Sequence, residues 1–249
     1  MKLPKPTWKR SFAVILVSLL IIAVSFTLWA SSTNPLMPEA EQALQDTETI
    51  DVSQAGYIAF MPLEAQPTMG YIFYPGGRVK AEAYAPMAHA LAEEGYFVAI
   101  VYAPLNLAFF GIGAGDAVIA DHPEITTWAV GGHSLGGVAA SLYATQNTTI
   151  EGLVFEASYP ADSNLRDRGD LKVLSIYATN DGLAKPEAIL ASSKDLPQNA
   201  QFIAIEGGNH GQFGYYGLQD GDGAATISHE EQTDLMVAAV SEFLASLLP

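Results

Sequence analysis

The feature that most constrains this chain is a repeated alternation of strand-like and helix-like segments from residue 50 onward. The strand-like segments are short and mostly apolar along their whole length: 50–53, 57–61, 70–74, 97–102, 128–130, 153–156, 172–177 and 201–205. The helix-like segments that separate or follow them are 80–95, 112–122, 135–145, 185–194 and 228–248. Apolar strands separated by helices indicate a mostly parallel sheet with helices on both faces. We therefore predict a three-layer α/β fold.

The loops that directly follow the strands are where a site is expected, because open α/β sheets bind ligands outside the carboxyl ends of their strands. One such loop, Gly132-His-Ser-Leu-Gly136, lies between the strand 128–130 and the helix 135–145. It matches the pattern G-x-S-x-G, in which a serine occupies a sharp strand-to-helix turn and small neighbours allow the backbones to approach closely. The pattern in this setting predicts a nucleophilic serine.

The serine of this turn is Ser134, and its hydroxyl is expected at the N-terminus of a helix. There the Leu135 N–H and the helix dipole would stabilise a developing negative charge. The alternatives are a turn that only serves close helix–sheet packing, or a phosphate-binding loop. The glycines fit neither G-x-G-x-x-G nor a phosphate-loop lysine pattern.

A serine hydroxyl needs a base, and the base needs an acid to orient it. Asp181 and His210 each follow the end of an apolar strand, and the chain order Ser134, Asp181, His210 is the order expected for this architecture. Taken singly, Asp181 could be a plain turn residue and His210 a loop histidine bonded to the backbone. Glu156, at the end of another strand, is an alternative acid.

The chain resembles the α/β-hydrolase superfamily, and within it a compact, bacterial, dienelactone-hydrolase-like group. The resemblance rests on the order of elements over residues 57–248 and on the three positions just named. It implies the three-layer α/β-hydrolase fold and a serine hydrolase. Ser134 would be the nucleophile, His210 the general base and then acid, and Asp181 the residue that orients His210.

The resemblance also implies a second oxyanion donor, in the loop after the strand 70–74. Relatives often have His-Gly-Gly there, whereas this chain has Pro75-Gly-Gly-Arg78. We expect the Gly77 N–H to be the donor, with the Arg78 N–H as the alternative. Backbone donors do not require the missing histidine.

The segment between the strands 153–156 and 172–177 is too short for the lid domain that many lipases and larger esterases insert there. An open pocket is therefore expected, with a carboxylic ester of small or medium size as substrate; amides, thioesters and lactones need the same machinery. Aromatic residues of the nearby loops are predicted to line it: Phe109, Phe110, Phe213 and Tyr215. The alternatives are an acyltransferase on the same machinery and a catalytically inactive binding protein with this fold.

The N-terminus predicts membrane insertion. Residues 1–10 carry four basic residues and no acid, and residues 12–30 carry no charge. As a helix the apolar run would span roughly 28 Å, close to the hydrocarbon thickness of a bilayer. We predict a basic cytoplasmic tail (1–10), a transmembrane anchor (11–30), a tether (31–49) and an extracytoplasmic α/β-hydrolase domain (50–249). The alternative is a signal peptide cleaved near Ala30-Ser-Ser32, which would leave a secreted protein.

Composition excludes several other classes. The formal net charge of −16 opposes nucleic-acid binding, and the absence of cysteine excludes disulfides and thiolate chemistry. Asp220-Gly-Asp-Gly223 begins like a calcium loop, but Ala224 and Ala225 stand where a ligand and a glycine are needed. We therefore expect no metal and no cofactor, and only a small-molecule ester and the lipid bilayer as partners.

Overall fold

The protein is described here by a computed structural model that covers residues 8–64, 66–162 and 164–248. Its sheet has eight strands: β1 (Ile50–Ser53), β2 (Tyr57–Pro62), β3 (Met69–Tyr74), β4 (Phe97–Val101), β5 (Thr127–His133), β6 (Ile150–Glu156), β7 (Lys172–Ala178) and β8 (Gln201–Ile205). The spatial order is β1-β2-β4-β3-β5-β6-β7-β8. β1 and β2 pair antiparallel at one edge, and every pairing from β4 to β8 is parallel.

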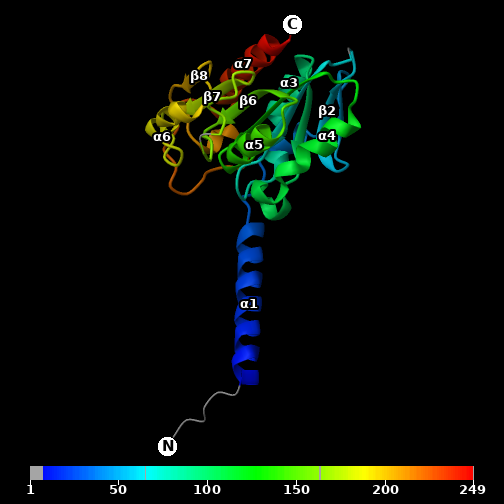
Figure 1. Ribbon diagram of the computed structural model, residues 1–249. Coiled ribbons are helices and arrows are strands. Elements are labelled where there is room, and N and C mark those ends of the chain that lie inside the picture. The colour runs from blue at the N-terminus through cyan, green and yellow to red at the C-terminus, as the bar shows by residue number, and fades with distance from the viewer. Residues whose placement is uncertain (1–7, 65, 163, 249) are drawn as a thin grey trace, which may run out of the picture.

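The α-helices are α1 (Trp8–Ser31), α2 (Pro38–Gln42), α3 (Ala85–Glu93), α4 (Gly115–Asp121), α5 (Leu135–Gln146), α6 (Pro186–Ala191) and α7 (His229–Leu247). Five 3-10 turns join them: η1 (Ala81–Tyr84), η2 (Pro104–Asn106), η3 (Ala108–Ala114), η4 (Ser192–Asp195) and η5 (Gly211–Phe213). In Figure 1 the domain lies at one end of α1, and the C-terminus lies at the opposite end of the domain.

Two buried apolar clusters cover the two faces of the sheet. The first unites side chains of α3 and α7 with one face, and the second unites side chains of α4 and α5 with the other. The strands between them are buried along nearly their whole length: every residue of β3, β4 and β5 is buried. Helix, sheet and helix therefore form the three predicted layers, and the mostly parallel sheet is confirmed.

The expected helix 80–95 is interrupted. Its first turn is the 3-10 turn η1, and the α-helix begins only at Ala85. Pro86 lies in the first turn of α3, where the missing N–H costs nothing, whereas in a helix interior it would remove a hydrogen bond. Gly95 follows the helix with φ +95°, a left-handed conformation that glycine adopts without strain.

The segment 31–49 is not a free tether. α2 lies within it, Ala40 is completely buried, and the Met37 N–H donates to the Tyr215 carbonyl at 3.0 Å. This stretch is polar in sequence, and its few apolar side chains suffice to fix it to the domain. Of the predicted cytoplasmic tail, residues 1–7 lie outside the described part of the chain, and the helix already includes residues 8–10.

No lid covers the sheet between β6 and β7. Residues 157–162 and 164–171, which the structure describes there, contain neither helix nor strand. The carboxyl ends of β5, β6 and β7 are thus left open for a site.

Candidate active site

Ser134 occupies the joint between β5 and α5. Its backbone has φ 52° and ψ −121°, a strained conformation for a residue with a side chain. The flanking glycines are required by space: a Cβ on Gly136 would overlap the Tyr74 carbonyl and lie 2.5 Å from the Pro75 oxygen, and one on Gly132 would lie 2.5 Å from the Gly136 carbonyl carbon. Backbone cannot yield as a flexible side chain can. The joint is therefore built to present this serine.

Neighbouring strand ends hold the strained turn in place. The Ser134 N–H donates to the Glu156 carbonyl at 2.9 Å, and the Ser158 hydroxyl donates to the Ser134 carbonyl at 2.6 Å. Both main-chain groups of Ser134 are thus satisfied by β6 and the loop that follows it. Such over-determination is what keeps a strained residue in position.

The structure brings Asp181 and His210 together. The Nδ1–H of His210 donates to Asp181 Oδ2 at 2.8 Å, and both side chains are almost completely buried. The other carboxylate oxygen of Asp181 accepts from the N–H groups of Leu183 and Ala184, each at 2.7 Å. With both oxygens accepting, the carboxylate is fixed, and it fixes the ring orientation of the histidine.

Ser134 and His210 line one cavity of about 330 Å³. The hydrogen bonds of the described residues include none between Ser134 Oγ and His210 Nε2. Because Nδ1 is bonded to Asp181, Nε2 is the ring nitrogen left for the serine. The other residues around this cavity are Leu135, Val138, Ala157, Ser158, Tyr159, Leu183, Ala184 and Gln219.

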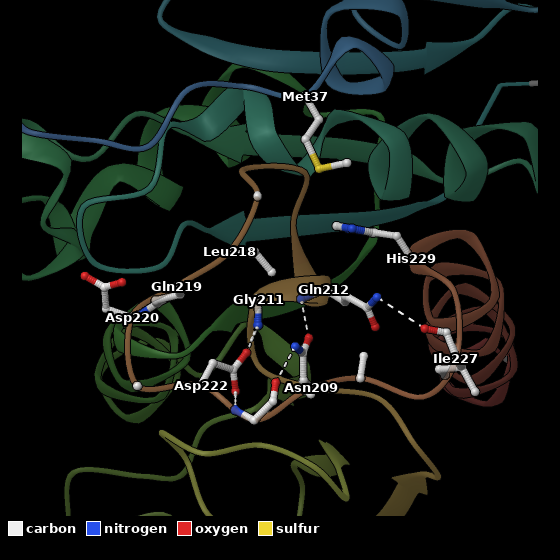
Figure 2. A pocket seen from close by; sticks show the side chains of 15 residues that line it. Met37, Asn209, Gly211, Gln212, Leu218, Gln219, Asp220, Asp222, Ile227 and His229 are labelled. Atoms are coloured by element: carbon white, nitrogen blue, oxygen red, sulfur yellow. Dashed lines mark hydrogen bonds between the residues drawn. The ribbon is translucent and has the colours of Figure 1, made fainter.

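Asp222 braces the two loops that carry Asp181 and His210. Its Oδ1 accepts from the N–H of Gly182 at 3.1 Å and of His210 at 3.3 Å, and its Oδ2 accepts from the Gly211 N–H at 2.8 Å. Figure 2 shows this carboxylate beside Gly211. In the sequence this aspartate suggested only a calcium ligand, and its role as a brace was not predicted. Its spacing from His210 carries no recognisable signal.

A larger cavity, of about 700 Å³, is lined in part by residues 217–225 and is the one drawn in Figure 2. Met37, Leu218, Asp220 and His229 are among its lining residues, whereas Ser134, Asp181 and His210 are not. Within residues 8–248, apart from 65 and 163, no cluster of three or more His, Asp or Glu could hold a metal ion. The larger of the two cavities is therefore not the one that contains the candidate catalytic residues.

The two expected oxyanion donors lie against each other. Leu135 is the first residue of α5, so its N–H has no acceptor within the helix. A Cβ on Gly77 would lie 3.0 Å from the Leu135 side chain, and the Gly77 N–H has no acceptor among the described residues. The alternative prediction, that the Arg78 N–H is the donor, is wrong, because this N–H donates to the Asn106 carbonyl at 2.7 Å.

A buried polar chain supports this loop. The Gly76 N–H donates to the Tyr84 hydroxyl at 2.9 Å, and that hydroxyl lies 2.9 Å from His133 Nδ1. Burial lowers the pKa of His133 well below its ordinary value, so its ring is neutral and can accept the tyrosine proton. The histidine of the elbow thus points away from Ser134 and holds the loop before Gly77.

Glu156 does not contact His210 and is not the orienting acid. It is completely buried, neither carboxylate oxygen has a hydrogen-bond partner among the described residues, and burial raises its pKa to about 8. The carboxyl is therefore protonated at neutral pH. Its backbone carbonyl, not its side chain, serves the nucleophile turn.

The structure corrects the predicted aromatic pocket. Phe213 is buried and stacked on His133, with ring centroids 5.6 Å apart. Tyr215 is buried beside His229, and Phe109 and Phe110 are exposed on η3. None of the four lines the cavity at Ser134. Proximity in sequence to a strand end does not say to which side a loop turns.

Comparisons with known proteins agree with the fold. Residues 70–234 match the alpha/beta hydrolase family. Est1E from Butyrivibrio proteoclasticus is similar in structure at 17% identity, with a TM-score of 0.56 over 80% of this chain and 99% of that one. The esterase domain of a Rhodothermus marinus protein is similar at 14% identity, with a TM-score of 0.56 over 75% and 92%.

A third structure, a predicted CIB-like hydrolase from Thermoplasma acidophilum, is similar at 12% identity, with a TM-score of 0.54 over 78% of this chain and 97% of that one. A comparison with curated protein sequences finds no significant match. These structural likenesses agree on the fold, and the family match extends from β3 into α7 and includes the strained turn at Ser134. The chain belongs to the alpha/beta hydrolase family.

Proposed function

We propose that the protein is a serine hydrolase that cleaves carboxylic esters through an acyl-enzyme on Ser134. The observation that carries the proposal is that a strained, partly exposed serine shares one cavity with His210, which is hydrogen-bonded to the buried Asp181. One of the similar structures is described as an esterase domain, which supports the choice of an ester over an amide.

In the first step Ser134 Oγ attacks the ester carbonyl carbon, and its proton passes to His210 Nε2. The Asp181 carboxylate, which accepts from Nδ1–H, stabilises the imidazolium that forms. The N–H groups of Leu135 and Gly77 bind the oxyanion. The alcohol then leaves with the proton from His210. A water molecule, activated by the same histidine, attacks the acyl-enzyme and releases the acid.

Residues around the cavity set the acyl group that fits. Val138, Tyr159 and Leu183 supply apolar walls, and Gln219 supplies a polar one. A volume of about 330 Å³ is at the small end of ligand pockets, which suits a small or medium acyl group.

We further propose that α1 anchors the enzyme in a membrane with the catalytic domain outside the cytoplasm. Among the described residues one helix is long and apolar enough to cross a bilayer, over Ser11–Ser31, and the apolar window of that helix is not buried in the protein. The basic residues before it favour a cytoplasmic N-terminus. The mature protein should therefore retain its N-terminal residues. An N-terminus near Ser31 would instead show cleavage and secretion.

A fluorophosphonate probe tests the nucleophile. The detergent-solubilised wild-type chain should be labelled, and Ser134→Ala should not, while Ser193→Ala, at an exposed serine of η4 away from the cavity, provides the control and should be labelled like wild type. Labelling of Ser134→Ala to the wild-type extent, or no labelling of folded wild type, would contradict the proposal. Products from a panel of esters, with and without an added alcohol, then show whether water is the acyl acceptor.

A further inference from the structure

Large apolar side chains are exposed on the loops that meet the end of α1. Phe109 and Phe110, on η3, are 44% and 57% exposed, Leu105 on η2 is 38% exposed, and Leu218, in the loop after η5, is 92% exposed. We call these four residues the apolar rim. Single exposed apolar residues are ordinary, but a group of them around the end of one apolar helix marks an interaction surface.

The apolar rim is contiguous with the end of α1. The Phe110 ring meets the Phe26 ring edge to face, with centroids 6.3 Å apart. The Asn106 side chain, between Leu105 and η3, donates to the Ala30 carbonyl at 3.4 Å. On the other side of the helix end, the Asn34 side chain donates to the Leu218 carbonyl at 2.9 Å.

Arg78 adds a fourth fastening. Its guanidinium donates to the Ser32 carbonyl at 3.1 and 2.7 Å and lies over the Trp29 ring, 5.0 Å from the centroid. Contacts therefore come from loops on both sides of the helix end. They fix the orientation of the domain on α1, which a free linker would leave open.

The depth of the rim follows from the geometry of α1. Phe26 lies five residues before the end of the helix at Ser31, which corresponds to about 7 Å along the helix axis. Since Phe110 contacts Phe26, it lies well before the end of the helix, beside residues that the anchor places in hydrocarbon. A ring at this depth is covered by acyl chains rather than by water.

Charge favours a neutral lipid surface as the occupant. Residues 103–115, which include η2 and η3, carry no charged side chain, although the chain as a whole has a net charge of −16. An acidic protein keeps its carboxylates away from a bilayer, where burying them is costly. The uncharged residues 103–115 thus lie beside the end of α1, where the proposed bilayer would be.

The cavity lies next to this surface. Gln219, which directly follows Leu218, lines the same cavity as Ser134 and His210. An ester that enters past Leu218 therefore comes from the membrane side of the domain.

We propose that the apolar rim inserts into the bilayer that holds α1, and that the enzyme takes its ester from the membrane rather than from solution. The substrate class is then a lipid-borne ester whose acyl or alcohol part is embedded in the leaflet. The substrate part of this proposal rests on the proposed ester hydrolase activity, and the insertion rests on the proposed anchoring by α1.

A spin label measures the insertion directly. The chain has no cysteine, so Phe110→Cys and Leu248→Cys each give a unique labelling site in the full chain. Leu248 follows α7, at the end of the domain opposite α1, and its side chain is exposed. In phosphatidylcholine vesicles the label at 110 should be relaxed by oxygen and protected from a water-soluble nickel chelate, and the label at 248 should show the reverse. Equal nickel accessibility at both sites would overturn the insertion. Dipolar coupling between two labels at 110 would show that a second copy covers the rim and would overturn it too.

Activity tests the source of the ester. The double variant Phe109→Ser/Phe110→Ser should lose about tenfold or more on a short-acyl ester of a long-chain alcohol embedded in vesicles, because two apolar anchors are removed. On a water-soluble short-chain ester it should match wild type, and Leu248→Ser should match wild type on both. Equal loss on both esters would overturn the proposed substrate class. If wild type hydrolyses neither ester, the ester hydrolase proposal fails, while the label depths still decide the insertion.

Discussion

The buried carboxyl of Glu156 makes a prediction about stability that can be worked through quantitatively. Its side chain has no hydrogen-bond partner among the described residues, and burial raises its pKa from an ordinary 4.5 to about 8. A carboxyl with a raised pKa binds more protons in the folded chain than in the unfolded chain. The folded state is therefore favoured at low pH and loses stability as the pH rises toward 8. Glu156→Gln keeps the shape and removes the titration.

The size of the effect follows from the interval between the two pKa values. Between pH 5 and pH 7 the unfolded chain has released this proton and the folded chain still holds it. Each pH unit in this range costs the wild type about 1.4 kcal/mol, so its free energy of unfolding should fall by about 3 kcal/mol relative to Glu156→Gln. The constant cost of burying an amide cancels in this comparison, because it does not depend on pH.

Urea unfolding of the full chain in detergent, at pH 5, 6 and 7, measures the difference. The buried Trp128 reports unfolding of the domain by fluorescence. Glu151→Gln, at an exposed position of the same strand, is the control and should follow the wild type at every pH. A wild-type minus Glu156→Gln difference that stays constant from pH 5 to pH 7 would refute a neutral buried carboxyl. Fluorophosphonate labelling of Glu156→Gln at pH 7 should remain at the wild-type rate, since the side chain does not contact His210.

Two further substitutions test how the site is held. Gly136→Ala places a Cβ on the Tyr74 carbonyl, so it should abolish labelling and lower the free energy of unfolding by about 1–3 kcal/mol. The control Gly169→Ala, whose Cβ would meet nothing within 4 Å, should change neither quantity. Wild-type labelling of Gly136→Ala in a folded sample would show that the close approach is not needed. Asp222→Ala leaves the N–H of His210 without its acceptor and should slow labelling about tenfold or more. Asp222→Asn keeps Oδ1 and should give an intermediate rate. Equal labelling rates for wild type and both variants would refute the bracing role.

The sequence was sufficient for the site wherever the chemistry is local. The turn with a serine between glycines at a strand-to-helix joint can be predicted from the sequence, because the glycines are required by backbone atoms a few ångströms away. Asp181 and His210 were identified because parallel strands bring their carboxyl ends to one edge of the sheet. Their 2.8 Å contact was then a consequence of the predicted strand order.

The features that the sequence could not predict depend on how long loops fold back. Asp222 reaches the two catalytic loops through hydrogen bonds to backbone N–H groups, which no residue pattern announces. Phe213 and Phe110 occur in equally plausible loops, yet one is stacked in the core and the other meets α1. Pro86 did carry a signal for the late start of α3, and the apolar spacing obscured it.

The position of the anchor follows from the same topology that builds the site. Arg78 follows β3, Asn106 and Phe110 follow β4, and Leu218 lies in the loop that follows β8, so all four fastenings at the end of α1 come from the carboxyl edge of the sheet. Ser134 and His210 lie at this edge because the strands before them are parallel. A helix fastened there brings the cavity toward whatever surrounds that helix. If α1 lies in a bilayer, as we propose, the catalytic serine faces the leaflet surface, and an ester dissolved in bulk water has the longer path to it.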